Sequence, residues 1–181
     1  YIEIAFRAAR QADSKTLLVL NQNHLEYEDD EGTRTATLNL LRKLKSKNVP
    51  IDALGMQAHL VANQKSFSAI KLTRFLNEVS AMGLKILITE MDVTDKYVSG
   101  TQQQIDQAVA DEYSRFLAPA LDNKSVMAVL TWGLSDKYSW LNSYGPRSDG
   151  RPVRPLPLDA NMNPKPAFHA IANAFDHAAK R

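Results

Sequence analysis

Four short aliphatic runs recur along the chain, and an amphipathic helical pattern separates each run from the next. The runs begin at Thr16, Ala53, Leu84 and Val126, so their starts lie about 31 to 42 residues apart. This spacing suits right-handed βαβ units, which build a parallel sheet with helices on its faces. The sequence therefore predicts an α/β fold with a parallel sheet.

The helical patterns place apolar residues at the i, i+3, i+4, i+7 spacing of one helix face. One pattern precedes the first aliphatic run, and the others alternate with the runs. The third stops at Gly83, a residue suited to the left-handed conformation that ends many helices. The last follows a loop rich in Pro, Gly and Asp at residues 144–166. The predicted helices cover residues 2–9, 37–44, 72–79, 105–117 and 168–175.

Two architectures use repeated βα units, and chain length and chemistry favour different ones. A closed eight-stranded barrel typically needs about 250 residues, so a length of 181 residues favours an open doubly wound sheet. A nucleotide-binding open sheet, however, needs a glycine-rich turn after its first strand. The segment "LVLNQNHLEY" contains no glycine. The open, nucleotide-binding sheet therefore lacks its main sequence signal.

Polar residues follow every aliphatic run, at the predicted carboxyl end of each strand. In a barrel these ends share one face, and the active site is built there. The pattern therefore predicts a polar site at one end of the parallel strands. Its members, strand by strand, are Asn21 and His24, then Gln57 and His59, then Glu90 and Asp92, then Trp132 and Asp136.

Composition excludes several other kinds of protein. A formal net charge of +2 is too small to suggest a nucleic-acid partner, and the basic run at residues 42–47 lies on a helical pattern. No apolar run is long enough to cross a bilayer. Cysteine is absent, which removes disulfides and cysteine metal sites. The chain starts at Tyr1 without a leader, so we expect it to be part of a longer polypeptide.

Four segments together resemble a known family. "GMQAHL", "ILITEMDV", "TWGLSDKYSWL" and "PLPLDANMNPKPAFHAI" are similar to the second half of the glycoside hydrolase family 10 barrel. Members of this family are endo-β-1,4-xylanases that cut xylan with retention of configuration. The resemblance implies a parallel (β/α) half-barrel, strands five to eight of a (β/α)8 barrel, in which residues 1–181 form a single (β/α)4 unit. It implies no cofactor and no metal, and a secreted or periplasmic location.

The resemblance assigns the catalytic roles to the third strand end. Glu90 matches the nucleophile, while His59 and Asp92 match residues that orient the nucleophile and keep it ionised. Without the motif, a glutamate at a strand end would more often bond a loop amide. A lone histidine such as His59 is likewise most often structural.

The resemblance assigns sugar binding to two tryptophans and two amides. Trp132 and Trp140 match aromatic residues whose faces suit the C–H faces of pyranose rings. Trp132 ends an otherwise buried run, so core packing is a competing role, whereas Trp140 lies in a loop and is the better binding candidate. Gln57 and Asn21 are expected to hydrogen-bond sugar hydroxyls.

The chain also departs from the family pattern. Gln22 and Asn23 stand where the family usually has Asp and Tyr, which puts binding on the leaving-group side in doubt. The first four strands are absent, and with them the Asn-Glu pair whose Glu is the acid/base. The only such pair here, Asn77-Glu78, falls within a helical pattern. The resemblance therefore implies that the chain carries one of the two catalytic carboxylates and lacks the other.

A half-barrel leaves strand edges and interior side chains uncovered, so it must be completed or repacked. The missing half could belong to the same gene product, a second copy could close a two-fold barrel, or the half could persist as an open sheet. Three functions follow. The chain is the nucleophile-bearing half of an endo-xylanase, a non-catalytic module that binds xylan or xylo-oligosaccharides, or a remnant that does neither.

Overall fold

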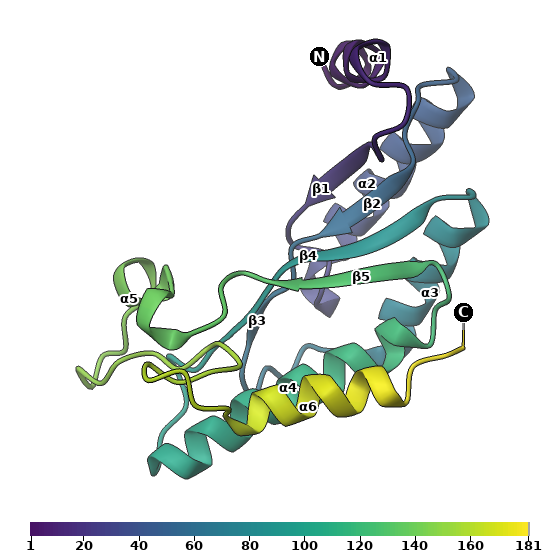
Figure 1. Cartoon of the computed structure of the whole chain (residues 1–181). Coiled ribbons are helices and arrows are strands. Elements are labelled where there is room, and N and C mark those ends of the chain that lie inside the picture. Colours follow the sequence, from purple (N-terminus) through teal and green to yellow (C-terminus); the bar gives the residue numbers. More distant parts are fainter. Residues whose placement is uncertain (181) are drawn as a thin grey trace.

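The computed structural model describes residues 1–180 and shows strands and helices in alternation (Figure 1). All strand pairings within the sheet are parallel, as the sequence predicts. In chain order the elements are α1 (Ile2–Ala12), β1 (Val19–Gln22), the 3-10 turn η1 (Glu28–Asp30), α2 (Glu31–Ser46), β2 (Ala53–Met56), β3 (His59–Val61), α3 (Ala69–Ala81), β4 (Lys85–Thr94), α4 (Gln102–Leu121), β5 (Val126–Thr131), the 3-10 turn η2 (Asp136–Tyr138), α5 (Leu141–Tyr144) and α6 (Pro166–Asp176).

The five predicted helices are present, and local sequence explains several of their ends. The Ser68 side chain accepts a hydrogen bond from the Lys71 amide and caps α3. Beyond that helix Gly83 has φ of 75°, the left-handed value predicted for it. Thr101 begins α4 with a capping box, in which the side chain of Gln104 also bonds back to the Thr101 amide.

The sheet follows the predicted repeat with one difference. Strand order is β1-β2-β4-β3, and β5 pairs with the other edge of β4. The aliphatic run that starts at Ala53 is divided into β2 and β3, because residues 57 and 58 leave the strand geometry. Strand β4 is longer than predicted and continues through Asp92 to Thr94, where it pairs with β3.

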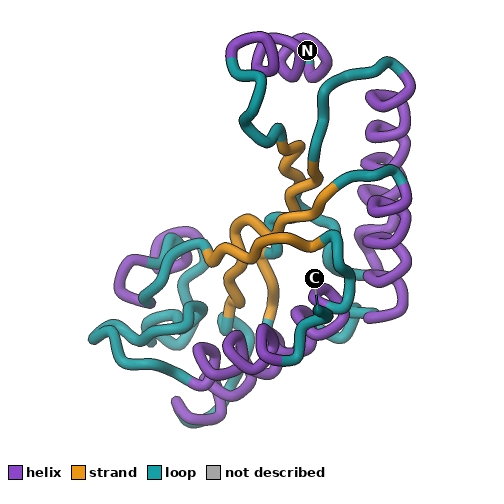
Figure 2. The backbone as a smooth tube through the Cα atoms, turned by 45° about the vertical axis from the view of Figure 1, so that its right-hand side comes forward, coloured by secondary structure: helices purple, strands orange, loops and turns teal. Residues whose placement is uncertain are grey.

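The strands form an open arc, and the long helices lie on one side of it (Figure 2). The helix-facing side of the sheet makes the core, where Leu54, Met56, Ile86 and Ile88 have no exposed surface. Helix α1 contributes no buried residue. The architecture is therefore an α/β half-barrel with one covered face.

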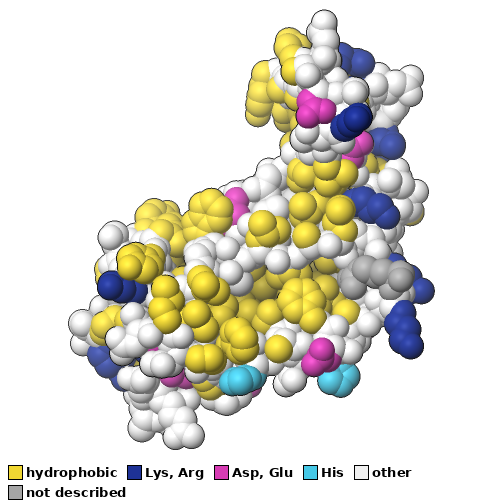
Figure 3. All heavy atoms as spheres, in the orientation of Figure 1, with side chains coloured by type: hydrophobic (Ala, Val, Ile, Leu, Met, Phe, Trp, Pro, Cys, Tyr) yellow, Lys and Arg dark blue, Asp and Glu magenta, His cyan; other side chains and the backbone are white. Residues whose placement is uncertain are grey.

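Exposed apolar side chains gather along β5 and α6. Figure 3 shows hydrophobic atoms gathered where β5 and α6 lie in Figure 1. Large contiguous apolar surface often marks an interaction site. No helix among residues 1–180 is long and apolar enough to cross a membrane. The large exposed apolar residues of these two segments include Met127, Leu130, Phe168 and Phe175.

Candidate active site

Glu90 lies on β4 at an irregularity in the sheet. Strand β4 places Ile88 opposite Val129 of β5, but Met91 opposite Thr131, so it carries one extra residue in this interval. Irregularities of this kind bend a strand and re-aim its side chains, and they are frequent beside active sites. The extra residue falls in the Thr89–Glu90 interval, at the carboxyl end of the paired strands.

Each carboxylate oxygen of Glu90 has one neighbour from another strand. Asn21 donates from Nδ2 to Oε1 at 2.7 Å. The His59 Nε2 atom lies 3.4 Å from Oε2. The Glu90 side chain is 15% exposed, so the carboxylate is held in place while part of it still faces the open side of the strands.

Asn21 is oriented by the residues beneath it. Thr89 donates its hydroxyl to Asn21 Oδ1 at 2.7 Å, which leaves the Asn21 amide nitrogen to point at Glu90. Gly55 leaves the space that this arrangement needs, because a Cβ at this position would lie 2.5 Å from Asn21 Oδ1. A strand glycine of this kind marks a close approach.

His59 connects Glu90 to a second, buried carboxylate. Its Nδ1 lies 2.9 Å from Asp92 Oδ1, and Trp140 donates its indole N–H to Asp92 Oδ2 at 2.7 Å. Burial disfavours the charged imidazole, but the hydrogen bond and charge of Asp92, together with Glu90, outweigh it and raise the pKa of His59 above 6.5. His59 therefore keeps a proton between two acids more readily than a free histidine.

Aromatic rings form one wall of the adjoining cleft. Trp140 packs on His59 with ring centres 5.2 Å apart, and Tyr144 stacks on Trp140 at 4.7 Å. Tyr144 is 78% exposed. The cleft presents aromatic faces next to amide and imidazole groups, a combination that suits a sugar. Its lining consists of Asn23, His24, Glu26, Gln57, His59, Trp140 and Tyr144.

Sequence comparison places the chain in a family. The family model described as Glycosyl hydrolase family 10 matches residues 1–174. The chain belongs to this family. It is 33% identical over 179 residues to endo-1,4-beta-xylanase C of Phanerodontia chrysosporium, an alignment that covers 97% of this chain and 41% of that xylanase. It is 32% identical to endo-1,4-beta-xylanase B of Thermotoga neapolitana, an alignment that covers 99% of this chain and 49% of that xylanase.

Solved structures of family 10 agree with the half-barrel. Native xylanase 10B of Thermotoga maritima superposes with a TM-score of 0.85 at 32% identity, covering 97% of this chain and 52% of that one. Xylanase 10B of Thermotoga petrophila RKU-1, solved in complex with xylobiose, superposes with a TM-score of 0.84. The superposition covers 97% of this chain and 51% of that one. The chain thus spans about half the length of these family 10 relatives.

The structure brings most of the predicted site residues together. Asn21 differs from expectation in one respect, because its side chain already bonds Thr89 and Glu90. Trp132 differs more. It is 49% exposed, because the open side of β5 leaves it uncovered. The competing role of core packing is therefore wrong for this chain. Those that meet are Glu90, His59, Asp92, Asn21, Trp140 and Gln57.

Sequence reasoning missed four residues of the candidate site. Thr89 and Gly55 had a visible signal, since a polar residue and a glycine both interrupt otherwise aliphatic strands. Tyr144 and Glu26 had none, because only the fold brings their loops to the cleft. Asn77 and Glu78 lie on α3, as predicted, and Glu78 pairs there with Arg42.

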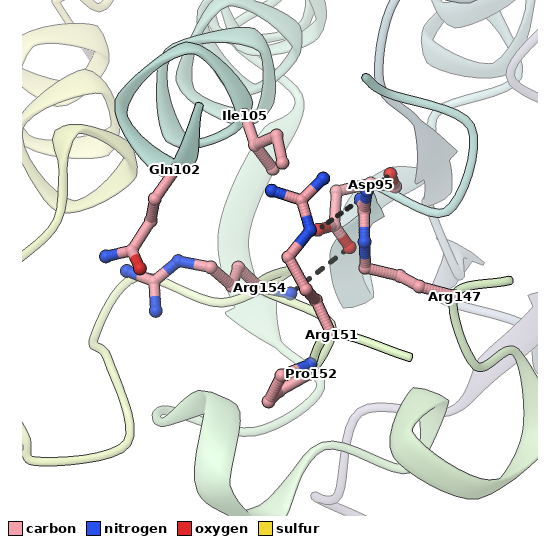
Figure 4. Close-up of a pocket in the computed structure, with 7 residues that line it drawn as sticks. All are labelled: Asp95, Gln102, Ile105, Arg147, Arg151, Pro152 and Arg154. Carbon is pink, nitrogen blue, oxygen red and sulfur yellow. Dashed lines mark hydrogen bonds and ion pairs between the residues drawn. The ribbon is translucent and has the colours of Figure 1, made fainter. Parts of the chain in front are cut away.

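A separate pocket lies beyond β4 and contains mostly paired charges (Figure 4). Asp95 receives the guanidinium of Arg147 and the backbone amide of Arg154. Arg151 is bound by Asp149, and Arg154 by Asp106. These pairs fix the long loop before α6 and leave little free charge for a ligand. Among residues 1–180 no group of three or more His, Asp or Glu side chains could hold a metal ion.

Proposed function

We propose that this chain is the nucleophile-bearing half of a retaining endo-1,4-β-xylanase, with Glu90 as the nucleophile. The observation that carries the proposal is the placement of Glu90, whose two oxygens are held by Asn21 and His59 at the carboxyl end of the strands. In retaining glycosidases one carboxylate attacks the anomeric carbon, and a second, about 5 to 5.5 Å away, acts as acid and then as base.

His59 and Asp92 would support that attack. A protonated imidazole beside Glu90 favours the ionised carboxylate, which is the nucleophilic form. Asp92 bonds Nδ1 of the same ring and so fixes its orientation, while Trp140 bonds the other Asp92 oxygen. The indole plane is then placed beside the cleft, where it could contact a xylose ring.

The second carboxylate would come from outside residues 1–180. Asp92 is occupied by His59 and Trp140, and the Glu26 oxygens accept the amides of Leu25 and Ala58. Neither is free to protonate a leaving oxygen. The exposed apolar side chains along β5 and α6 support an N-terminal half-barrel as the source, because such a half would also cover that surface (Figure 3).

A second copy of the chain is the less supported source. A two-fold barrel would bring the partner copy's Asp136, at the end of its β5, toward Glu90. In this chain Asp136 is buried, lies 2.8 Å from Lys165 and accepts the Leu156 amide. An acid held by an ammonium group inside its own loop is a poor proton donor to a neighbouring subunit.

Fragment complementation tests the proposal. The chain is mixed with the separately produced N-terminal half of the Thermotoga neapolitana xylanase, and reducing ends released from xylan are measured. We expect the chain alone to be slower than the mixture by about 100-fold to 10,000-fold, the usual contribution of general acid–base catalysis. Glu90→Gln should abolish the activity of the mixture, and early products should retain the β configuration.

Glu78→Gln is the matched control, because Glu78 is an exposed glutamate paired with Arg42 on α3. It should leave the activity unchanged. Hydrolysis by the mixture that survives Glu90→Gln would refute the nucleophile assignment. Full activity of the chain alone would refute an external acid/base, and a dimer seen by light scattering under those conditions would identify the second copy as its source.

The stacked Trp140 and Tyr144 favour a second candidate, a non-catalytic module that binds xylo-oligosaccharides. Calorimetric titration with xylohexaose distinguishes the two functions. Binding that Trp140→Ala weakens, with no hydrolysis in the complemented mixture, would support the binding module. Absence of both would leave only a structural remnant.

A further inference from the structure

The register against β4 shifts between the end of β2 and the start of β3. Met56 lies opposite Ile88, so an unbroken parallel ladder would place His59 opposite Met91. Instead His59 lies opposite Asp92. Met91 is apolar and buried in the core, whereas Asp92 bonds the His59 ring. The register shift therefore decides whether His59 meets the acids of the site.

The shift occurs at Ala58, which has φ of 60°. A residue with a Cβ reaches this left-handed conformation at a cost of roughly 1 to 2 kcal/mol, so the surroundings must hold it there. The Ala58 carbonyl still accepts the Asp92 amide on one side. Its own N–H points to the opposite side, away from β4, and needs a separate acceptor.

Glu26 supplies that acceptor. Its Oε1 receives the Ala58 N–H at 2.9 Å, and its Oε2 receives the Leu25 N–H at 2.8 Å. The residue is only 4% exposed, and it lines the same cleft as Gln57 and His59. A buried carboxylate with two amide donors holds both segments in fixed positions.

The next residue in sequence repeats the arrangement. The Tyr27 hydroxyl accepts the Val61 N–H at 2.7 Å. Within residues 1–180 β3 pairs with β4 alone, so its other edge has no strand partner. Two consecutive side chains, Glu26 and Tyr27, thus bind the amides that a neighbouring strand would otherwise bind.

We infer that Glu26 is a positioning residue that holds Ala58 in its left-handed conformation and thereby sets His59 against Asp92 and Glu90. This inference rests on the proposed function for its consequence in catalysis, but its geometric part does not depend on hydrolysis. Glutamine at position 26 keeps one carbonyl acceptor and replaces the other with an amide donor, so it cannot bind both N–H groups. Glycine at position 58 adopts φ of 60° without steric cost and needs less support.

NMR spectroscopy of the histidine side chains tests the inference. The His59 resonances are assigned with His59→Gln, and the ring is titrated in the unmodified chain, in Glu26→Gln and in Glu26→Gln/Ala58→Gly. We expect Glu26→Gln to move the His59 resonances and bring its pKa toward the ordinary value of about 6.5. Xylohexaose affinity should fall about tenfold, the effect of one lost hydrogen bond. The added Ala58→Gly should restore both the His59 titration and the xylohexaose affinity. If Glu26 acted only by packing, a glycine at position 58 would not restore them.

Glu78→Gln is the control, because it neutralises a glutamate on α3 that pairs with Arg42 and does not contact the strand break. It should leave the His59 titration unchanged. Unaltered His59 resonances in a folded Glu26→Gln chain would overturn the inference, as would a double variant that remains shifted. If Glu26→Gln alone does not fold, the double variant must fold with His59 restored, and failure to do so also overturns it. A normal His59 response without hydrolysis would refute only the proposed function.

Discussion

Two clusters of carboxylates lie near the carboxyl ends of the strands, and they have different partners. In the site, the acids meet an amide, an imidazole and an indole. In the clamp that holds the long loop before α6, the acids meet guanidinium and ammonium groups. The site acids are Glu90 and Asp92, and the clamp pairs are Asp95 with Arg147, Asp106 with Arg154, and Asp136 with Lys165.

This difference distinguishes charges that stabilise the fold from charges that are available to a ligand. A buried acid that is paired with a Lys or Arg side chain has its charge balanced, and removal of one partner leaves the other uncompensated. An acid held by an amide, an indole and a titratable imidazole, with no Lys or Arg beside it, keeps more of its charge for a ligand. Variants in the clamp should therefore destabilise the chain, whereas variants in the site should change its chemistry more than its stability.

The largest effect should come from breaking the clamp at Arg147. Its side chain is 3% exposed and that of Asp95 is fully buried, with the two groups 3.1 Å apart. Arg147→Met leaves Asp95 without its counter-charge and should lower the free energy of unfolding by about 3 to 5 kcal/mol. Urea denaturation measures the change. Arg42→Met, which removes an exposed pair with Glu78, should cost less than about 1 kcal/mol, and an equal loss in both variants would contradict the distinction.

A smaller effect should come from crowding the site at Gly55. Alanine places a Cβ against Asn21 Oδ1, so Asn21 must turn away from Thr89 and Glu90. We expect a loss of roughly 1 to 3 kcal/mol in unfolding free energy, typical of overpacking, and a larger fractional loss of hydrolysis in the complemented mixture. Gly32→Ala on α2, where an added Cβ meets no atom within 4 Å, should not destabilise the chain. Full activity of Gly55→Ala would show that Asn21 does not orient Glu90.

The fold was largely readable from the sequence because periodicity reports burial. Helical stripes and aliphatic runs each mark buried side chains, and the two patterns alternate along the chain. The βα repeats and the parallel sheet were therefore predicted. The break between β2 and β3 was not, because Ala58 is an ordinary strand residue and its left-handed conformation depends on Glu26, which is distant in sequence. Local pattern carries no information about such a partner.

The site was predicted less completely, for a related reason. Glu90, His59 and Asp92 follow strands and could be placed at one end of the sheet, and the family resemblance gave them roles that remain predictions. The indole N–H of Trp140 on Asp92 depends on how the loop after β5 folds back. The exposure of Trp132 depends on what lies over the open side of β5, which no local property of residues 126–132 reports.

A third prediction concerns the neutral donors of the site. Trp140→Phe keeps an aromatic face but removes the N–H that reaches Asp92 at 2.7 Å. It should cost about 1 kcal/mol of unfolding free energy, the net value of one hydrogen bond, and weaken xylohexaose binding less than Trp140→Ala does. Thermal melts and calorimetry measure both quantities. A loss as large as that of Arg147→Met would show that Asp92 belongs with the clamp acids.

The smallest effect should be a dependence of stability on pH that the site shows over the neutral range and the Arg147–Asp95 pair does not. Because Asp92 and Glu90 raise the pKa of His59 above 6.5 in the folded chain, the folded state binds this proton more tightly than the unfolded state. The contribution is fully present below about pH 6.5 and disappears as the pH rises through the folded pKa.

The free energy of unfolding of the unmodified chain minus that of His59→Gln should therefore shrink from acid to alkaline pH, as urea denaturation at several pH values would show. The same difference taken with Arg147→Met should stay nearly constant over the neutral range, since a guanidinium stays charged there. A His59 difference that grows toward alkaline pH would mean that its ring is held neutral, as acceptor rather than donor to one of the two acids. Glu90 would then have no cation beside it, and its ionised form would depend on Asn21 alone.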